Sequence, residues 1–202
     1  MAICWRKTRW VIAGALGVCA AAAQSDPGLV AHGFLMVGGR QVPYEVQHLP
    51  PASYPQLPQP IADELSRRGC LIPQTYEAHR PENVIEGSFE QEGSSDWAVL
   101  CAAGGEVKLM VFFGSDPAHP ITLGSAEETQ RVQAYPGGEE MGFNWGIDPA
   151  SPNVVHDLQR GIWPRPKRLD HDALADSLVD FDQKTTYHYY TQGHWTVIKM
   201  PH

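Results

Sequence analysis

The chain has 202 residues, of which 43% are hydrophobic and 19% are charged, a composition typical of a globular protein with one domain or at most two small ones. Its 19 glycines and 17 prolines interrupt the backbone too often for long helices or coiled coils. The formal net charge of −8 argues against nucleic acid as a partner, because phosphate binding needs a basic surface.

The first 23 residues have the pattern of an export signal. Three basic residues lie near the start, an apolar stretch spans Trp10 to Cys19, and a run of small residues ends at Ala23. The apolar stretch is shorter than the roughly 20 residues that a transmembrane helix needs. We therefore expect a periplasmic or secreted protein that begins at Gln24 and has no transmembrane segment after removal of the signal.

Two alternatives for this N-terminal region stay open. The signal could be retained as a membrane anchor. The chain could also be lipidated at Cys19, because the residues from Leu16 to Cys19 loosely resemble a bacterial lipobox, although Val18 stands where that pattern has Gly or Ala.

Cys70 and Cys101 are the two cysteines that remain after signal removal. An even pair in an exported chain predicts a disulfide, which would stabilise the fold by about 3–4 kcal/mol on the chain-entropy model. The alternative is a pair of buried free thiols. A Cys-x-x-Cys motif is absent from the sequence, so neither a zinc knuckle nor a thioredoxin-type redox site is indicated.

Residues 24–60 are predicted to form an extended, Pro-rich leader. Within it, two apolar stretches, Phe34–Val37 and Val42–Val46, flank Gly38-Gly39 and predict a short hairpin. Five prolines between positions 50 and 60 favour extended or polyproline II backbone.

A short helix over about 61–68 follows this leader. Pro60 presets the backbone of a first helical turn, and Ile61 and Leu65 share one helix face. Gly69 then provides a C-terminal stop.

Residues 61–202 are predicted to form a single, mainly β domain of antiparallel hairpins. Apolar and β-branched stretches predict strands at 84–90, 97–102 and 107–113, with a Gly-Gly turn between the last two. A final hairpin pairs residues 185–191 with 194–200 across Gln192-Gly193. Residues 114–165 predict loops around short strands.

Two acidic segments lie eighty positions apart, at 88–99 and 168–179. Each carries a carboxylate at its third, fifth and ninth positions: Glu90, Glu92 and Asp96 in the first copy, and Asp170, Asp172 and Asp176 in the second. Each also precedes a predicted strand and hairpin. The chain is therefore predicted to contain two related units, at about 84–113 and 164–200.

These segments resemble the FG-GAP repeat of integrin-like and bacterial surface β-propellers, whose loop reads roughly D-F-N-G-D-G-x-x-D-L-A-V. The matching residues are Phe89, Gly93, Asp96, Ala98 and Val99 in the first copy, and Asp170, Asp172, Asp176, Leu178 and Val179 in the second. The resemblance implies propeller-blade-like units and calcium bound by the acids. The chain departs from the pattern at Ser88 and Arg168, which take the first acidic position, and at Ala173, which replaces the glycine.

The six acids therefore have two main interpretations. Calcium takes six to eight oxygen ligands, which three converging carboxylates would help to supply. Alternatively, acids in turns accept hydrogen bonds from nearby backbone N–H groups and bind no metal. Full propellers need four or more blades, and with two recognisable units a complete seven-bladed propeller is excluded, so a compact two-unit β fold is expected.

The final hairpin is rich in aromatic residues. Strand alternation places Tyr187, Tyr189 and Thr191 on one face and His188 and Tyr190 on the other. Four aromatics form a candidate binding surface, although such residues are as common in the core of a small β domain: Tyr187, Tyr189, Tyr190 and Trp195.

The expected function is binding rather than catalysis. An acidic, exported domain with FG-GAP-like hairpins is similar to small bacterial envelope proteins that inhibit lysozyme-type hydrolases, and its negative charge would steer a cationic hydrolase toward it. We therefore expect a protein partner in the envelope and no cofactor apart from a possible calcium ion. The alternatives are a secreted hydrolase that uses the acidic loops, and a structural envelope module.

Overall fold

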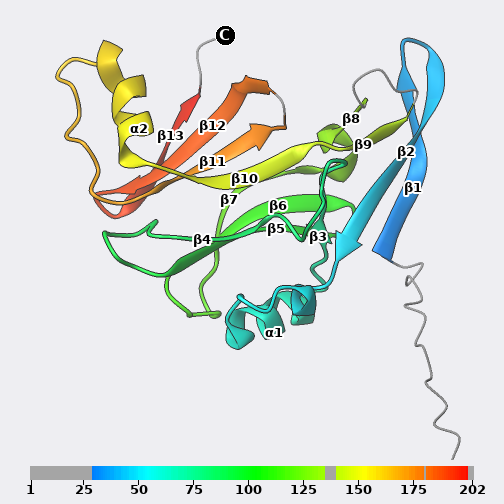
Figure 1. Cartoon of the computed structure of the whole chain (residues 1–202), viewed down its shortest axis with the longest axis horizontal. Helices are drawn as coiled ribbons and strands as arrows, with labels where there is room; N and C mark the ends of the chain where they lie inside the picture. Colours follow the sequence, from blue (N-terminus) through cyan, green and yellow to red (C-terminus); the bar gives the residue numbers. More distant parts are fainter. Residues whose placement is uncertain (1–28, 135–139, 180, 200–202) are drawn as a thin grey trace, which may run out of the picture.

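The computed structural model describes residues 29–134, 140–179 and 181–199 (Figure 1). The expected export signal, its cleavage site and Cys19 lie outside the described residues. Within the described ranges the chain forms 13 strands in three sheets and two short α-helices. The expected mainly β fold is thus confirmed. Of the helices described, none has the length and apolar character that crossing a bilayer requires.

The first sheet is a four-stranded antiparallel meander in chain order, made of β4 (Val84–Gly87), β5 (Asp96–Ala103), β6 (Glu106–Phe112) and β7 (Ile121–Glu127). The three strands predicted in this region are confirmed, together with the turn between β5 and β6. Gly104 and Gly105 adopt φ of 62° and 84° there, a conformation that favours glycine. The first strand ends earlier than predicted, and β7 lies in the region predicted to hold loops around short strands.

The second sheet repeats this topology with β10 (Trp145–Ala150), β11 (Ala173–Leu178), β12 (Phe181–Thr191) and β13 (His194–Lys199). The predicted final hairpin is confirmed, with Gln192-Gly193 as its turn. Between β10 and β11 the chain forms the helix α2 (Pro152–Leu158) and a short 3-10 turn, Gln159–Gly161, in the region where the sequence predicts loops around short strands.

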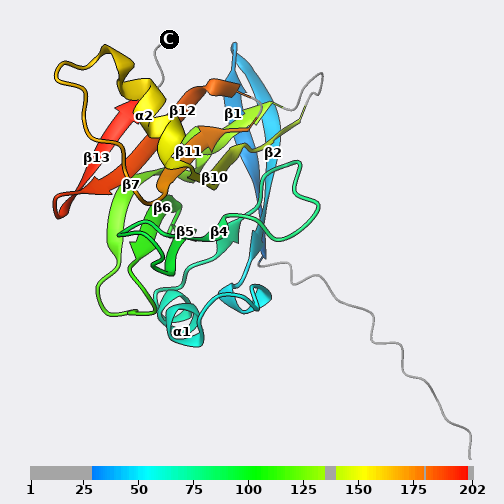
Figure 2. The ribbon, with the colours of Figure 1, turned by 60° about the vertical axis from the view of Figure 1, so that its left-hand side comes forward.

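The two meanders pack face to face, and the main core lies between them (Figure 2). In β5, Ala98 and Leu100 point into this core, where Ile147 and Leu174 of the second meander meet them. The alternate residues of β5 point the other way and are buried as well. Strand β5 is therefore covered on both faces, which explains its almost uninterrupted apolar sequence.

Each helix covers the outer face of one meander. Helix α1 (Gln59–Arg67) buries Ile61 and Leu65 in the cluster that also contains Trp97, and the predicted helix near 61–68 is confirmed. The predicted disulfide is present between Cys70, just after α1, and Cys101 of β5. Helix α2 packs on the second meander through a separate apolar cluster: Ala150, Val155, Ala173, Ala175 and Tyr189.

The third sheet contains the hairpin of β1 (Val30–Val37) and β2 (Arg40–Leu49), which projects at the right of Figure 1. Strand β2 pairs in parallel with β9 (Met141–Phe143), and β9 pairs in turn with β8 (Val132–Ala134). Strand β2 also pairs with the short strand β3 (Ile72–Pro73). The predicted hairpin across Gly38-Gly39 forms and extends beyond its predicted ends. Val46 is 1% exposed in the main core, so this part of the expected leader packs into the folded body. Short 3-10 turns also lie at Pro51–Ser53 and Glu128–Arg131.

Candidate functional site

A groove of about 830 Å³ follows the seam between the two meanders. Val84 and Ile85 of β4 line one side, and Ile147 and Asp148 of β10 line the other. Both strands are the outer strands of their sheets, so two sheet edges meet at the groove. The segment at 53–56 and the loop at 75–83 form its rim.

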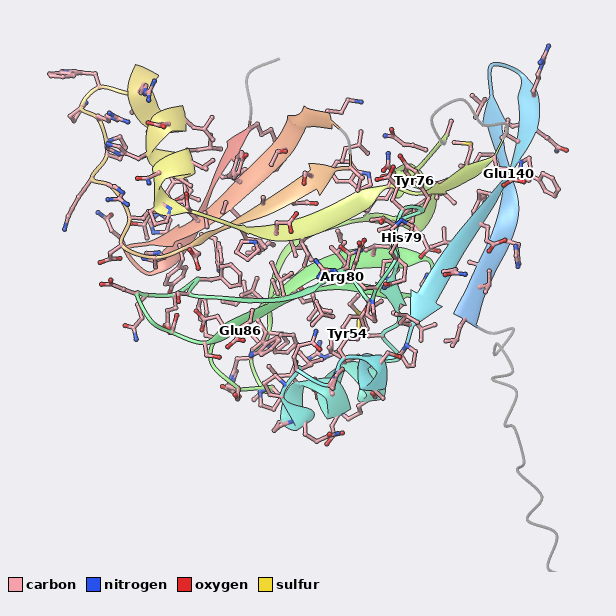
Figure 3. The ribbon with its side chains drawn as sticks, in the orientation of Figure 1. Tyr54, Tyr76, His79, Arg80, Glu86 and Glu140 are labelled. Atoms are coloured by element: carbon pink, nitrogen blue, oxygen red, sulfur yellow. A yellow bond between two sulfur atoms is a disulfide. The ribbon has the colours of Figure 1, made fainter. Side chains whose placement is uncertain are left out.

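A buried polar network fixes the rim loop in place. Gln74 donates through Nε2 to the Tyr54 hydroxyl at 2.8 Å, and that hydroxyl donates to the backbone oxygen of Glu82 at 2.6 Å. The backbone N–H of Glu82 donates back to Gln74 Oε1 at 2.9 Å. Burial raises the pKa of Tyr54, so its hydroxyl stays protonated as a donor. Figure 3 shows Tyr54 below the loop that carries His79 and Arg80.

The side chain of Glu82 is held within this frame. Its Oε2 accepts a hydrogen bond of 2.7 Å from the Thr75 hydroxyl, and both residues line the groove. The next residue, Asn83, is buried and bridges the sheets, because its Nδ2 donates to the backbone oxygens of Pro73 at 2.7 Å and Trp145 at 3.3 Å. Glu82 is therefore presented to the groove by a rigid support.

Glu82 and Asp148 are two acidic residues of the groove whose negative charges repel each other. Partial burial of the Asp148 carboxyl raises its pKa, and the negative charge of Glu82 raises it further. Neither carboxylate forms an ion pair with another of the described residues. Glu77 and Arg80 also line the groove, so its formal charge is negative. This arrangement favours a positively charged ligand.

In the first predicted acidic segment, the last of the three carboxylates is bound by the protein itself. Asp96 is fully buried, and its Oδ2 accepts hydrogen bonds of 2.8 Å from the backbone N–H groups of Phe89 and Glu90, and one of 2.5 Å from the Ser94 hydroxyl. Its Oδ1 accepts a further bond of 2.8 Å from the backbone of Gly114. These bonds also explain why β4 ends before Phe89. Glu90 and Glu92 are exposed on the same turn.

The three acids of the second segment lie in three different environments. Asp170 is exposed and lies 2.8 Å from His171 Nδ1, and Asp172 accepts a bond of 3.2 Å from the backbone N–H of Ser88. Asp176 is buried and pairs with Arg131 at 3.2 Å. Across the described part of the chain, no three His, Cys, Asp or Glu side chains are grouped to hold a metal ion. The calcium site stays a prediction.

The two acidic segments also differ in conformation. Asp96 is the first residue of β5, whereas Asp176 is the fourth residue of β11. In the first copy Gly93 adopts φ of 75° within a turn, whereas in the second copy Ala173 and Leu174 already alternate into the two apolar clusters. The strand therefore begins earlier in the second copy. The FG-GAP resemblance itself stays a prediction.

The predicted aromatic surface is divided between two sides of the second meander. Tyr187 and Tyr189 pack in the cluster under α2. Tyr190 and Trp195 are half-buried and contact Phe113, with ring-centroid distances of 4.9 and 6.1 Å respectively. A role of these four residues in binding stays a prediction.

The sequence interpretation missed the groove acids. Glu82 and Asp148 are 66 positions apart and lie in no motif, and the folded sheets alone bring them to one seam. No protein-family model, curated protein or solved structure matches the chain. The function is therefore inferred from the geometry of the groove and from the charge of the chain.

Proposed function

We propose that the chain is an exported envelope protein that binds a cationic protein partner, and that the groove between β4 and β10 receives a Lys or Arg side chain of that partner. The observation that carries this proposal is the pair of carboxylates, Glu82 and Asp148, which line one groove without a cation paired to either among the described residues.

The electrostatics of the groove favour such a ligand. Two negative charges that line one partly buried site repel, and a cation bound close to both replaces the repulsion with two attractions. Thr75 and the network beneath it already hold Glu82 in place, so little side-chain order has to be gained on binding. The net charge of −8 attracts cationic proteins over a longer range. A cationic hydrolase of the lysozyme type is the proposed partner.

Calorimetric titration of the chain with lysozyme at low ionic strength tests this proposal. We expect binding that the double variant Glu82→Gln/Asp148→Asn weakens by about tenfold or more, because close charge pairs at interfaces have large coupling energies. The matched control is Glu90→Gln/Glu92→Gln, which removes two exposed charges from outside the groove lining. We expect it to weaken binding by about twofold, through lost long-range attraction only.

Two results would contradict the proposal. Absence of binding would exclude lysozyme-type hydrolases as the partner. Equal weakening by the groove and control variants would show that binding follows net charge and does not involve the groove.

A second candidate function is hydrolysis of a glycoside. Burial and the charge of Glu82 raise the pKa of Asp148, which is the direction that favours a general acid, and Glu82 is a second carboxylate in the same groove. This candidate predicts release of reducing ends from peptidoglycan, with the release abolished in Asp148→Asn. If the chain shows neither this activity nor lysozyme binding, a structural envelope role remains.

A further inference from the structure

The loop that follows α2 is strongly basic in an otherwise acidic protein. Four of the chain's 15 Lys and Arg residues fall between positions 160 and 168, and the same span contains no Asp or Glu. These four residues are all exposed: Arg160, Arg165, Lys167 and Arg168. In Figures 1 and 2 this loop lies at the left-hand margin, and in Figure 1 the β1–β2 hairpin lies at the opposite end of the molecule.

The same loop exposes apolar side chains. Trp163 is 93% exposed, the highest value among the exposed large hydrophobic residues of the described chain, and its neighbour Ile162 is 47% exposed. An indole ring in full contact with water has no role in the core. Exposed aromatic and aliphatic residues beside cations are typical of surfaces that contact a partner.

Contacts with α2 hold Arg160 and Arg165, whereas Lys167 and Arg168 at the end of the loop stay free to contact a partner. Asp157 of α2 pairs with Arg160 at 2.8 Å and lies 3.7 Å from Arg165, which also donates to the backbone oxygen of His156. Neither Lys167 nor Arg168 forms an ion pair with a described residue. Lys167 contributes only the smallest of several causes that lower the pKa of Asp170, the first being the hydrogen bond with His171.

We propose that this loop docks the protein on the surface of an anionic phospholipid bilayer. Trp163 and Ile162 would enter the interfacial layer, where indole rings are favoured, and the basic residues would face the lipid phosphates. A soluble polyanion could bind the basic residues, but it would not remove the side chains of Ile162 and Trp163 from water. Because the chain as a whole is acidic and is repelled by such a membrane, the basic loop is the part of the described structure that can approach it.

Tryptophan emission tests the proposal at the loop itself. The signal of Trp163 is the difference between the full-length chain and its Trp163→Phe variant, so membrane contact by another segment does not produce it. We expect this difference signal to shift to shorter wavelength with vesicles of phosphatidylcholine that contain roughly a quarter phosphatidylglycerol. We expect no shift with vesicles of phosphatidylcholine alone.

Charge variants measure the contribution of the cations. The variant Lys167→Gln/Arg168→Gln should lower the partition coefficient on the anionic vesicles roughly 25-fold, because each cation near such a surface contributes about fivefold. The control Arg40→Gln/Lys199→Gln removes two exposed cations elsewhere and should change it less than about threefold. Thermal midpoints of both variants verify that the fold is retained.

Three results would overturn the proposal. The first is an unshifted Trp163 signal with anionic vesicles at low salt. The second is an equal effect of the loop and control variants. The third is the same spectral shift with soluble inorganic polyphosphate, which would show that the loop binds anions without entering a bilayer. Each result is independent of lysozyme binding at the groove.

Discussion

Asp96 illustrates at the scale of one residue how a motif-like carboxylate can serve the fold. The sequence allowed two roles for it, a calcium ligand or a partner of backbone N–H groups in a turn. In the structure both of its oxygens accept hydrogen bonds from the protein, and the residue is completely buried. The turn before β5 is therefore organised around one carboxylate.

Replacing Asp96 with Asn should destabilise the protein by about 3 kcal/mol, because the amide offers one acceptor oxygen in place of two and leaves buried N–H groups without a partner. Chemical denaturation measures the loss in free energy of unfolding. The exposed Glu92→Gln on the same turn is the control, and its effect should stay within about 0.5 kcal/mol. Equal effects of the two substitutions would contradict this role of Asp96.

His188 predicts a pH dependence of stability. It lies in the core near the Asp176–Arg131 ion pair, and its Nε2 has no hydrogen-bond partner among the described residues. Burial lowers its pKa, the charge of Asp176 opposes this shift, and that of Arg131 adds to it. The folded protein thus favours neutral His188. The contribution of His188 to stability is therefore complete above the ordinary histidine pKa, and it is lost as the pH falls below about 6.5, because the unfolded chain then binds the proton more readily than the folded protein does.

The variant His188→Gln removes this titration. Free energies of unfolding measured between neutral and mildly acidic pH should fall less steeply in the variant than in the unsubstituted chain. Parallel pH profiles for the two proteins would contradict the assignment.

At the scale of elements, the sequence predicted what local patterns encode. Two Gly-Gly turns and one Gln-Gly turn predicted three hairpins, and Pro60 and Gly69 marked the two ends of α1. It did not predict α2, whose seven residues are held by packing of Val155 on the second meander. It also did not predict that β2 would pair with β9, nearly a hundred positions later, since nothing local specifies that partner.

The acidic segments give a prediction at this scale. Among the described residues no three acidic side chains are grouped to hold a metal ion, and both oxygens of Asp96 already accept hydrogen bonds from the protein. Millimolar calcium should therefore not raise the thermal unfolding midpoint. A ligand that binds the folded state must raise it. A clear upward shift with calcium, absent with magnesium, would restore the calcium interpretation.

At the scale of the whole molecule, two meanders of like topology enclose one core, and their outer strands meet at the groove. The disulfide joins the segment after α1 to the first meander, on the side of that sheet away from the second. The sequence could not reveal this site, because Glu82 follows Pro81 in a rim loop and Asp148 lies in an outer strand. Their proximity depends on how the sheets pack, which residue spacing does not encode.

The most direct test of the groove as a cation site is the titration of Asp148 followed by the NMR signal of its carboxyl carbon, in the free protein and with lysozyme bound. In the free protein its pKa should lie above the ordinary aspartate value, because of burial and the charge of Glu82. A cation placed between the two carboxylates must lower that pKa by thermodynamic linkage. A pKa that lysozyme leaves unchanged would contradict the account.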